Sequence, residues 1–392
     1  MKTTSDVKLL FDLGMQPISN RFLMNADSEK KLFPLKLAQS QKTGLIQLME
    51  PVPYEELVPI FDWITYNEPE EHLDGLVDEI FQYLPKNKSL NIGGVSWKDH
   101  STLERFSQKG CKTWVLDMKK DLSLSKHVGV ESVQNAFSQN KAISLANKYG
   151  RSDLLIARHI WEHAYNHTDF SNALKELVKD DGLIYLEIPD CENQIKNFDY
   201  TTIWEEHLYY YTPSTFSIAL NQCGFDILLM KKFPYPHESA IAVLMKKCES
   251  NRIKFDNNEI SRELAMGQKW GEMFNQTKKA IHKYLSEKTK KGGITLFGAG
   301  HFSHAFISFF GVDKYINCVI DDNTNKKGMM MPIGKIPIVG SNILQDLDIN
   351  LCLLAFNPTL HEKVISKYKY FEERGGEFAS IFPGTNREME VL

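Results

Sequence analysis

The stretch that decides the fold spans residues 89–117 and reads SLNIGGVSWKDHSTLERFSQKGCKTWVLD. It opens with a short apolar segment that ends in Gly93 and Gly94, continues through a predicted helix over 101–108, and closes with a strand-like segment ending at Asp117. A strand, a glycine turn, a helix and a second strand that ends in an acid form the opening unit of a doubly wound nucleotide-binding sheet. The stretch therefore predicts a nucleotide-binding α/β domain.

A second copy of this pattern lies at residues 293–322, GITLFGAGHFSHAFISFFGVDKYINCVIDD. Here Gly298 and Gly300 precede a predicted helix over 302–310, and the following strand ends at Asp321. The spacing from the first glycine to the acid is nearly the same in both copies. Because each copy can open its own parallel sheet, the chain is predicted to contain two α/β domains.

Alternating strand-like and helical segments extend both units, which favours mostly parallel sheets. The segments expected to complete the first unit are 152–157, 170–179, 183–188, 214–223, 224–230 and 241–246. The segments expected to extend the second unit are a strand over 348–356 and a helix over 360–373. Two helical patterns, at 260–273 and 277–288, form a predicted connector between the units.

The first 75 residues have a different character, with short strand-like pieces at 9–13 and 44–49 interrupted by prolines. We therefore expect three parts. Residues 1–75 would form a small N-terminal module, residues 76–250 the first α/β domain, and residues 251–392 the helical connector with the second α/β domain.

Composition excludes several classes of protein. The chain has 392 residues, a formal net charge of −4 and 42% apolar residues, so nothing in its overall charge indicates nucleic acid or a membrane surface as a partner. The six cysteines are scattered without the two-residue gap of a metal or redox motif, which is typical of free thiols in a reducing compartment. With no secretory signal and no apolar run of membrane length, the expected location is cytoplasmic, as a monomer or homodimer.

Several strings resemble the deoxysugar C-methyltransferases, which methylate a carbon of a nucleotide-linked keto-sugar. The strings lie in the family's order and cover nearly the whole chain: FDLGMQPISNRF at 11–22, the segment from Asp153 to His163, TIWEEHLYY at 202–210, and FGAG at 297–300 with Asp321 and Asn357. The resemblance implies a zinc-binding N-terminal module, a class I methyltransferase domain and a Rossmann-like C-terminal domain. It also implies S-adenosyl-L-methionine as cofactor and a nucleotide-linked sugar as substrate.

The chain departs from the family in three places. Ser40 and Thr43 stand where the family has a Cys-x-x-Cys pair, and no cysteine precedes Cys111, so we expect a module without zinc and no other metal. The glycine loop lacks the usual acid, has Asn91 instead, and carries the bulky Trp97. Trp204 replaces a tyrosine of the family.

The resemblance implies roles for a set of polar residues. His207 is the expected base that removes a proton beside the ketone, because an imidazole titrates near neutral pH. Glu206 would orient His207 or contact the sugar, and His163 would relay the proton or stabilise the enolate. Gly93, Gly94 and Asp117 would bind the cofactor, with the acid holding the ribose. The alternative for His163 is that it has no catalytic role and lies at the end of a helix or loop with its hydrogen bonds satisfied.

Five residues are expected to contact the substrate: Tyr210, Tyr66, His237, Gly298 and Gly300. Tyr210 would stack on or face the ligands, Tyr66 would reach in from the N-terminal module, and His237 precedes the strand over 241–246. Gly298 and Gly300 would let a diphosphate approach the following helix.

Two alternative functions remain open from the sequence. The chain could be a relative that lost methyl transfer and carries out another proton transfer on a sugar nucleotide, with Trp97 filling the methionine site. It could instead be a nicotinamide-dependent oxidoreductase that uses the loop from Gly298 to Gly300.

Overall fold

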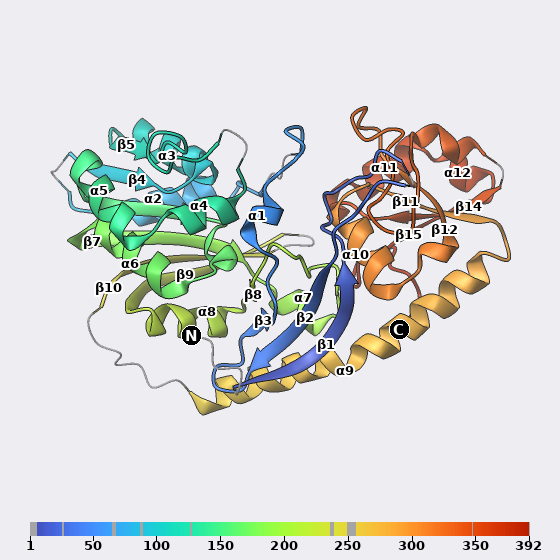
Figure 1. The fold of residues 1–392 in the computed structure, drawn as a ribbon, viewed down its shortest axis with the longest axis horizontal. Coiled ribbons are helices and arrows are strands. Elements are labelled where there is room, and N and C mark those ends of the chain that lie inside the picture. Colours follow the sequence, from blue (N-terminus) through green and yellow to red (C-terminus); the bar gives the residue numbers. More distant parts are fainter. Residues whose placement is uncertain are drawn as a thin grey trace.

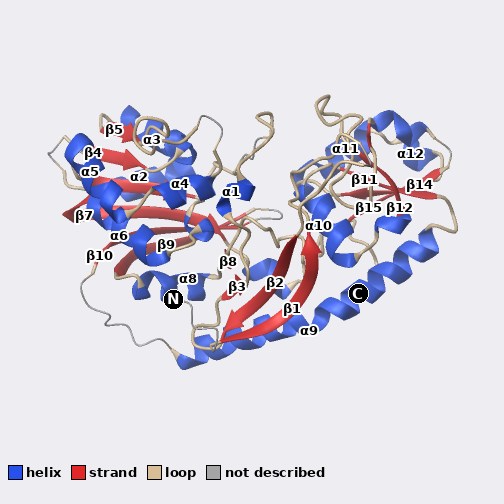
Figure 2. Cartoon of the chain, viewed as in Figure 1, coloured by secondary structure: helices blue, strands red, loops and turns tan. Residues whose placement is uncertain are grey.

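The computed structural model describes residues 6–25, 27–64, 68–86, 89–125, 128–235, 239–248, 256–346 and 348–391. Two α/β lobes lie side by side, and a long helix runs beneath both of them (Figure 1). A strongly twisted antiparallel pair of strands crosses that helix between the lobes (Figure 2). The two lobes correspond to the two glycine units of the sequence.

The first lobe is built on a six-stranded sheet with the order β5-β4-β6-β7-β10-β9. Neighbours among β5, β4, β6 and β7 run parallel, whereas β10 is antiparallel to both β7 and β9. A reversed strand inserted next to the last one is the arrangement of class I methyltransferases. The bounds of these strands are Asn91–Gly94 for β4, Lys112–Val115 for β5, Ser152–Arg158 for β6, Val178–Pro189 for β7, Phe225–Pro234 for β9 and Ser239–Lys247 for β10.

Helices cover both faces of this sheet, which explains why all seven residues of β6 are buried. One face packs on α2 (Leu73–Tyr83) and α3 (His100–Gln108). The other face packs on α4 (Val130–Ala136), α5 (Gln139–Tyr149), α6 (His167–Leu177) and α8 (Pro213–Gln222). The predicted helix over 170–179 was too long at its end, because β7 already begins at Val178.

The second lobe is a five-stranded parallel sheet with the order β13-β12-β11-β14-β15. Its strands are β11 (Gly293–Phe297), β12 (Ile316–Ile320), β13 (Ile338–Val339), β14 (Ile349–Leu354) and β15 (Glu377–Ser380). The helix α10 (His301–Phe310) follows the glycine loop, as predicted. The predicted helix over 360–373 is two helices, α11 (His361–Lys367) and α12 (Tyr370–Glu373), because the chain turns at Tyr368 to pack its ring into the sheet.

The predicted connector is one continuous helix, α9 (Asn257–Lys288), rather than two. The N-terminal module is an antiparallel sheet of β1 (Val7–Gln16), β2 (Phe33–Ser40) and β3 (Ile46–Leu48), with the short α1 (Tyr54–Leu57) and α7 (Glu192–Lys196) beside it. The fourth strand of this sheet, β8 (Tyr209–Tyr210), comes from the first lobe and pairs with β3. The module is thus joined to the lobe by a shared sheet.

Aromatic rings attach the module to α9. Phe11 of β1 packs edge-on against Trp270 at a centroid distance of 5.0 Å and stacks on Phe274 at 5.1 Å. Tyr200 stacks on Trp270 at 5.3 Å and donates a hydrogen bond to the Trp270 carbonyl. Buried side chains of the module, of α9 and of the second lobe form one continuous core.

The turn where the family has zinc ligands is held by amide and hydroxyl groups. Ser40 Oγ accepts hydrogen bonds from the backbone N–H groups of Lys42 and Thr43, each at 3.3 Å. The buried Gln39 donates to the carbonyls of Gly44 and Glu263 at 2.9 and 2.7 Å. Gly44 has a φ of +75°, and a Cβ there would lie 2.5 Å from Glu263 Cβ, so the turn can approach α9 only because the residue is glycine.

Among the helices that the structure describes, none combines the length and the apolar character needed to cross a bilayer.

Candidate active site

A cavity of about 600 Å³ lies where the N-terminal module and both lobes meet. This volume is in the range of small-molecule sites, which are about 300–1,000 Å³. The module supplies Asn20, the methyltransferase lobe supplies the ends of its parallel strands, and the second lobe supplies His301 and Phe302. Its polar lining residues include Glu68, Lys98, Glu131, His159, Glu162, His163, Asp190, Glu206 and His207.

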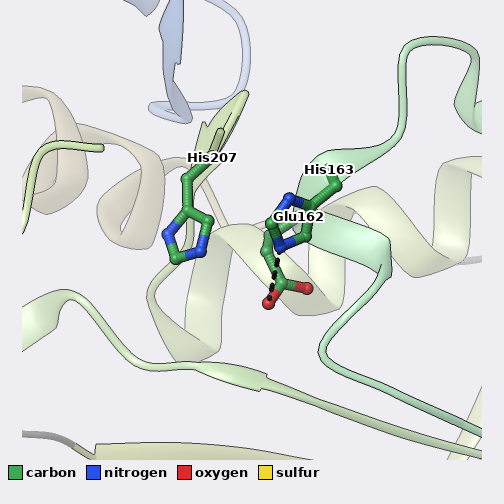
Figure 3. A group of neighbouring side chains, drawn as sticks. All are labelled: Glu162, His163 and His207. Carbon is green, nitrogen blue, oxygen red and sulfur yellow. Dashed lines mark ion pairs between the residues drawn. The ribbon is translucent and has the colours of Figure 1, made fainter. Parts of the chain in front are cut away.

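The two Glu-His strings of the sequence meet in this cavity. Glu162 and His163 follow β6 on a 3₁₀ helix, Trp161–His163, and His207 lies in the turn before β8. The N–H of Leu208 donates to the carbonyl of Glu162 at 2.9 Å, which ties the two segments together. The rings of His163 and His207 stand edge to face, with centroids 4.8 Å apart and planes at 88°. Figure 3 shows both rings beside the carboxylate of Glu162.

The loop that carries His207 is supported by Tyr210. This tyrosine is buried, and its hydroxyl accepts from the Trp204 N–H at 3.0 Å and donates to the Trp204 carbonyl at 2.9 Å. Tyr210 does not line the cavity and lies behind the loop; its predicted contact with a ligand stays a prediction. Because residues 204–207 form a turn, the side chains of Glu206 and His207 both reach the cavity.

Glu131 is a cavity residue that the sequence analysis missed. It lies on α4, is 2% exposed, and places Oε1 2.6 Å from Nδ1 of His163. Burial alone would lower the pKa of His163, but the neighbouring Glu131 carboxylate outweighs burial and raises that pKa above the ordinary value. His163 is therefore the histidine of this pair that favours the charged form.

His207 has the opposite character. Burial, followed by the charges of His163 and His301, holds the pKa of His207 well below its usual range. Burial, followed by the carboxylates of Glu131 and Glu205, raises the pKa of Glu206 well above its usual range. Glu206 also accepts a hydrogen bond from Asn20 Nδ2 at 3.4 Å. The shifts in pKa therefore favour the neutral form of His207 and of Glu206 and the charged form of His163.

The Glu162, His163 and His207 side chains also have the spacing of a metal site, since one ligand-type atom from each lies within 4.8 Å of the others. Both oxygens of Glu162 are buried and have no hydrogen-bond partner among the residues that the structure describes. The nearest cationic group is His163 Nε2, 3.8 Å from Oε1 of Glu162. The expectation of a chain without metal stays a prediction.

The glycine loop after β4 faces the protein rather than the cavity. A Cβ on Gly93 would lie 2.4 Å from the Trp114 ring, and one on Gly94 would lie 2.8 Å from Leu103. Asp99 fills the loop, since its Oδ2 accepts from the N–H groups of Val95 and Ser96 at 2.8 and 2.9 Å. Trp97 and Lys98, which follow Ser96, line the cavity instead.

Asp117 follows β5 at the same end of the sheet. Its Oδ1 accepts from the backbone N–H groups of Lys119 and Lys120 at 3.0 and 2.8 Å, and its carboxylate is partly exposed. Asp117 does not itself line the cavity, but the adjacent Met118 does. An exposed acceptor at the end of β5 and a cavity edge at Trp97 and Met118 fit a nucleoside that bridges the ends of the two strands.

The second lobe contributes His301 rather than its glycines. His301 stacks on Trp204 with centroids 4.3 Å apart, and burial lowers the pKa of His301 to about 4. Gly298 has a φ of +104° and a Cβ there would meet the Ala355 carbonyl, whereas the space beside Gly300 is open. Neither glycine lines the cavity. Two further predicted contacts, Tyr66 and His237, lie outside the described residues.

Three domain models of known proteins match the chain in sequence order. They are a zinc binding domain over residues 3–57, a methyltransferase domain over 66–229 and the C-methyltransferase C-terminal domain over 250–383. The first match occurs although no cysteine precedes Cys111. Among curated proteins, the C-methyltransferase NovU of Streptomyces niveus is 21% identical over 391 residues, covering 94% of this chain and 91% of NovU.

Solved structures with some similarity include the glycopeptide N-methyltransferase MtfA, at 10% identity and a TM-score of 0.30, over 48% of this chain and 100% of that one. The CcbJ methyltransferase from Streptomyces caelestis is 8% identical with a TM-score of 0.31, over 48% of this chain and 94% of that one.

The strand order and the matched domains define the class: this chain is an S-adenosylmethionine-dependent methyltransferase with a class I fold. The three matched domains lie in the order that the resemblance implies, and the resemblance to the C-methyltransferases predicted from the sequence is confirmed.

Proposed function

We propose that this enzyme methylates a carbon beside the ketone of a nucleotide-linked keto-sugar, in the cytoplasm. The observation that carries the proposal is the meeting of His163 and His207 in one cavity bounded by all three domains. Methylation at such a carbon needs a base for the C–H proton and a positive group for the oxygen of the resulting enolate. The two histidines, with their different charges, can supply both.

His207 is the proposed base. Its neutral imidazole takes the proton as the carbon–hydrogen bond breaks, and the electron pair of that bond becomes the new double bond of the enolate. His163, as an imidazolium, stabilises the enolate oxygen. Glu206, kept neutral by burial and by its acidic neighbours, can donate a hydrogen bond to a sugar oxygen.

S-adenosyl-L-methionine, when bound, supplies an electrophilic methyl group and leaves as a neutral thioether. Asp117 would hold the ribose, and Trp97 and Met118 would flank the nucleoside at the ends of β4 and β5. Gly93 and Gly94 support this surface indirectly, since they let Trp114 and Leu103 pack beneath it.

The sugar nucleotide would enter from the side of the second lobe. The stacked rings of Trp204 and His301 offer a flat surface there, with Phe302 beside them. Gly298 and Gly300 shape the loop that presents His301 to the cavity, and diphosphate near the start of α10 agrees with the dipole of that helix.

The nicotinamide alternative finds less support. The acid that would hold a ribose in the second lobe, Asp321, is used by its own domain: Oδ2 accepts from the Ala299 N–H at 3.1 Å and from Lys326 Nζ at 2.9 Å. The alternative that methyl transfer is lost requires Trp97 to fill the cavity, whereas the Trp97 side chain lies in the cavity wall and is 37% exposed.

Calorimetric titration of the purified enzyme with S-adenosylmethionine and, separately, with NAD tests the proposal. We expect binding of the first and none of the second. Binding of NAD without S-adenosylmethionine would contradict the proposal. A second arm adds a nucleoside diphosphate-linked 4-keto-6-deoxyhexose in D₂O and measures deuterium uptake beside the ketone, which the enzyme should catalyse.

A further inference from the structure

The contact between Glu131 and His163 bears on which of the two histidines carries a charge and which accepts a proton. We propose that Glu131 is a positioning residue, whose carboxylate keeps His163 charged and turned toward the cavity, so that His207 is the partner left free to accept a proton. This inference rests on the proposed function, in which one histidine acts as acid and the other as base.

The geometry of the pair supports an electrostatic role. Glu131 Oε1 and His163 Nδ1 are 2.6 Å apart, both side chains are at least nine-tenths buried, and the contact is an ion pair rather than a well-aligned hydrogen bond. The Coulomb attraction between two charges shielded from water is stronger than at the surface, because the dielectric screening is lower, and this attraction opposes the cost of burying the charges. The other oxygen of Glu131 fills the space beside Gly129, the residue that precedes α4.

The opposite edge of the His163 ring faces the site of chemistry. Because Glu131 holds Nδ1, Nε2 is the nitrogen on the side of Glu162, at 3.8 Å, and the ring edge lies next to His207. A carboxylate that holds one nitrogen of an imidazole sets the orientation and the charge of the ring, as in catalytic triads. Here the carboxylate comes from α4 and the imidazole from the end of β6.

The charged groups described around these two rings, with the exception of Lys98 at His163, are consistent with this division. Around His163 stand Glu131 on α4, Glu162 on its own 3₁₀ helix, His207 in the turn before β8, and Lys98 after β4. Around His207 stand two cationic or potentially cationic rings, His163 and His301, with His159 and Lys98 further away. Both carboxylates near the pair therefore favour charge on His163, while the positive groups keep His207 neutral, which is the form that can accept a proton. The enolate formed in the same step offsets the charge that His207 then acquires.

The test compares Glu131→Gln and Glu131→Asp with the unaltered enzyme, all full length. Nitrogen-15 labelled histidine reports, without any substrate, whether both ring nitrogens of His163 carry protons at pH 7.5; the signal is assigned with His163→Asn. We expect an imidazolium in the unaltered enzyme and in Glu131→Asp, and a neutral ring in Glu131→Gln. A neutral His163 in the unaltered enzyme, or a charge unaffected by Glu131→Gln, would overturn the inference.

Kinetics give the second readout, with the keto-deoxyhexose nucleotide as probe. Glu131→Gln should lower kcat by about 10- to 100-fold, a part of the 10²–10⁴-fold effect of acid–base groups, with little change in KM. Glu131→Asp should restore much of the loss. Glu263→Gln, which removes a buried carboxylate on α9 away from the cavity, serves as the matched control and should leave kcat unchanged.

The outcomes separate this inference from the proposed function. If the unaltered enzyme does not process the sugar nucleotide, the function fails, while the nitrogen-15 spectra still decide the role of Glu131. If the enzyme is active but Glu131→Gln keeps its full kcat, the inference alone fails. A stoichiometric divalent cation found by elemental analysis, and lost in His163→Asn, would also overturn it, since a cation between Glu162 and the two rings would exclude the imidazolium.

Discussion

At the scale of single residues, the cavity shifts the pKa values of two chemically identical groups in opposite directions. His163 faces two carboxylates, whereas His207 faces His163 and His301, so burial acts on both but only His163 is compensated. Buried ionisable groups with shifted pKa values in a cavity are characteristic of catalytic sites. The difference between the two rings comes from their neighbours alone.

Replacing His207 by glutamine should abolish the base and keep the shape of the site. We expect kcat to fall by at least about 100-fold, together with solvent deuterium uptake beside the ketone, while the affinity for S-adenosylmethionine stays within threefold. His282→Gln is the matched control, because His282 lies on α9 and contacts Phe310 outside the cavity. A variant at His207 that still exchanges deuterium at the normal rate would rule out this base.

Buried neutral histidines should also make the fold sensitive to acid. Burial, followed by the charge of His301, lowers the pKa of His304 from 6.5 to about 3. Below pH 6.5 His304 binds a proton in the unfolded chain but not in the folded protein. The contribution of His304 to the free energy of unfolding is therefore fully present above pH 6.5 and is lost as the pH falls toward 3.

His304→Leu should therefore lose less stability between pH 7.5 and pH 5 than the unaltered enzyme does. The expected difference is about 2 kcal/mol, from roughly 1.4 kcal/mol per pH unit. Urea midpoints at the two pH values measure it. Equal losses in both proteins would show that His304 is already charged in the folded state.

The sequence located the Glu-His strings, and with them His163, Glu206 and His207, because each string follows a recognisable strand or turn. It did not locate Glu131 or His301. Both belong to helices with ordinary patterns, and only the tertiary packing of α4 and α10 brings them to the same cavity. A pattern along the chain does not show which residues tertiary packing brings into one cavity. The roles of the predicted residues stay predictions.

At the scale of elements, the loop after β4 shapes the wall of the cavity where we propose that the cofactor binds. Its glycines serve the packing of Trp114 and Leu103, its first N–H groups are taken by Asp99, and Trp97 forms part of the cavity wall. The sequence predicts cofactor binding at Gly93 and Gly94, and this role stays a prediction. Which residue a glycine makes room for depends on the strand beside it, and that could not be read from the loop alone.

The Trp97→Ala variant tests whether the indole borders the cofactor position or occupies it. If the indole flanks the sulfonium nucleoside, its loss should weaken S-adenosylmethionine binding by roughly fivefold or more, since a cation–π contact contributes about 1 kcal/mol. Calorimetry on the two proteins measures the change. An increase in affinity would mean that the indole occupies the cofactor position.

The turn at Gln39 shows how another element holds its shape. Gln39→Leu would leave the carbonyls of Gly44 and Glu263 without their donor, which should cost about 1–3 kcal/mol of stability. Gln41→Leu, an exposed amide on the same turn, should change stability by less than about 0.5 kcal/mol. Urea unfolding of both variants makes the comparison, and equal midpoints would show that the contact with α9 is dispensable.

At the scale of the whole molecule, the cavity exists only because three parts converge. The module contacts the first lobe through β8 and contacts α9 through Phe11. The second lobe contacts the first through the stacking of His301 on Trp204. These contacts hold the three parts together around the cavity. The two α/β units and the helical connector could be predicted from glycine spacing and periodicity. The shared sheet through β8 could not, because two tyrosines give no sign of which sheet they join. The predicted domain limits at 75 and 250 stay a prediction.

The most direct test of the central claim follows the methyl group itself. The enzyme is incubated with S-adenosylmethionine labelled with carbon-13 in the methyl group and with the keto-deoxyhexose nucleotide, and the product is examined by carbon–carbon and carbon–proton correlation NMR. We predict a labelled methyl group bonded to the carbon beside the ketone, formed by the unaltered enzyme and not by His207→Gln. A methyl group bonded to oxygen or nitrogen, or one formed equally well by His207→Gln, would contradict the account.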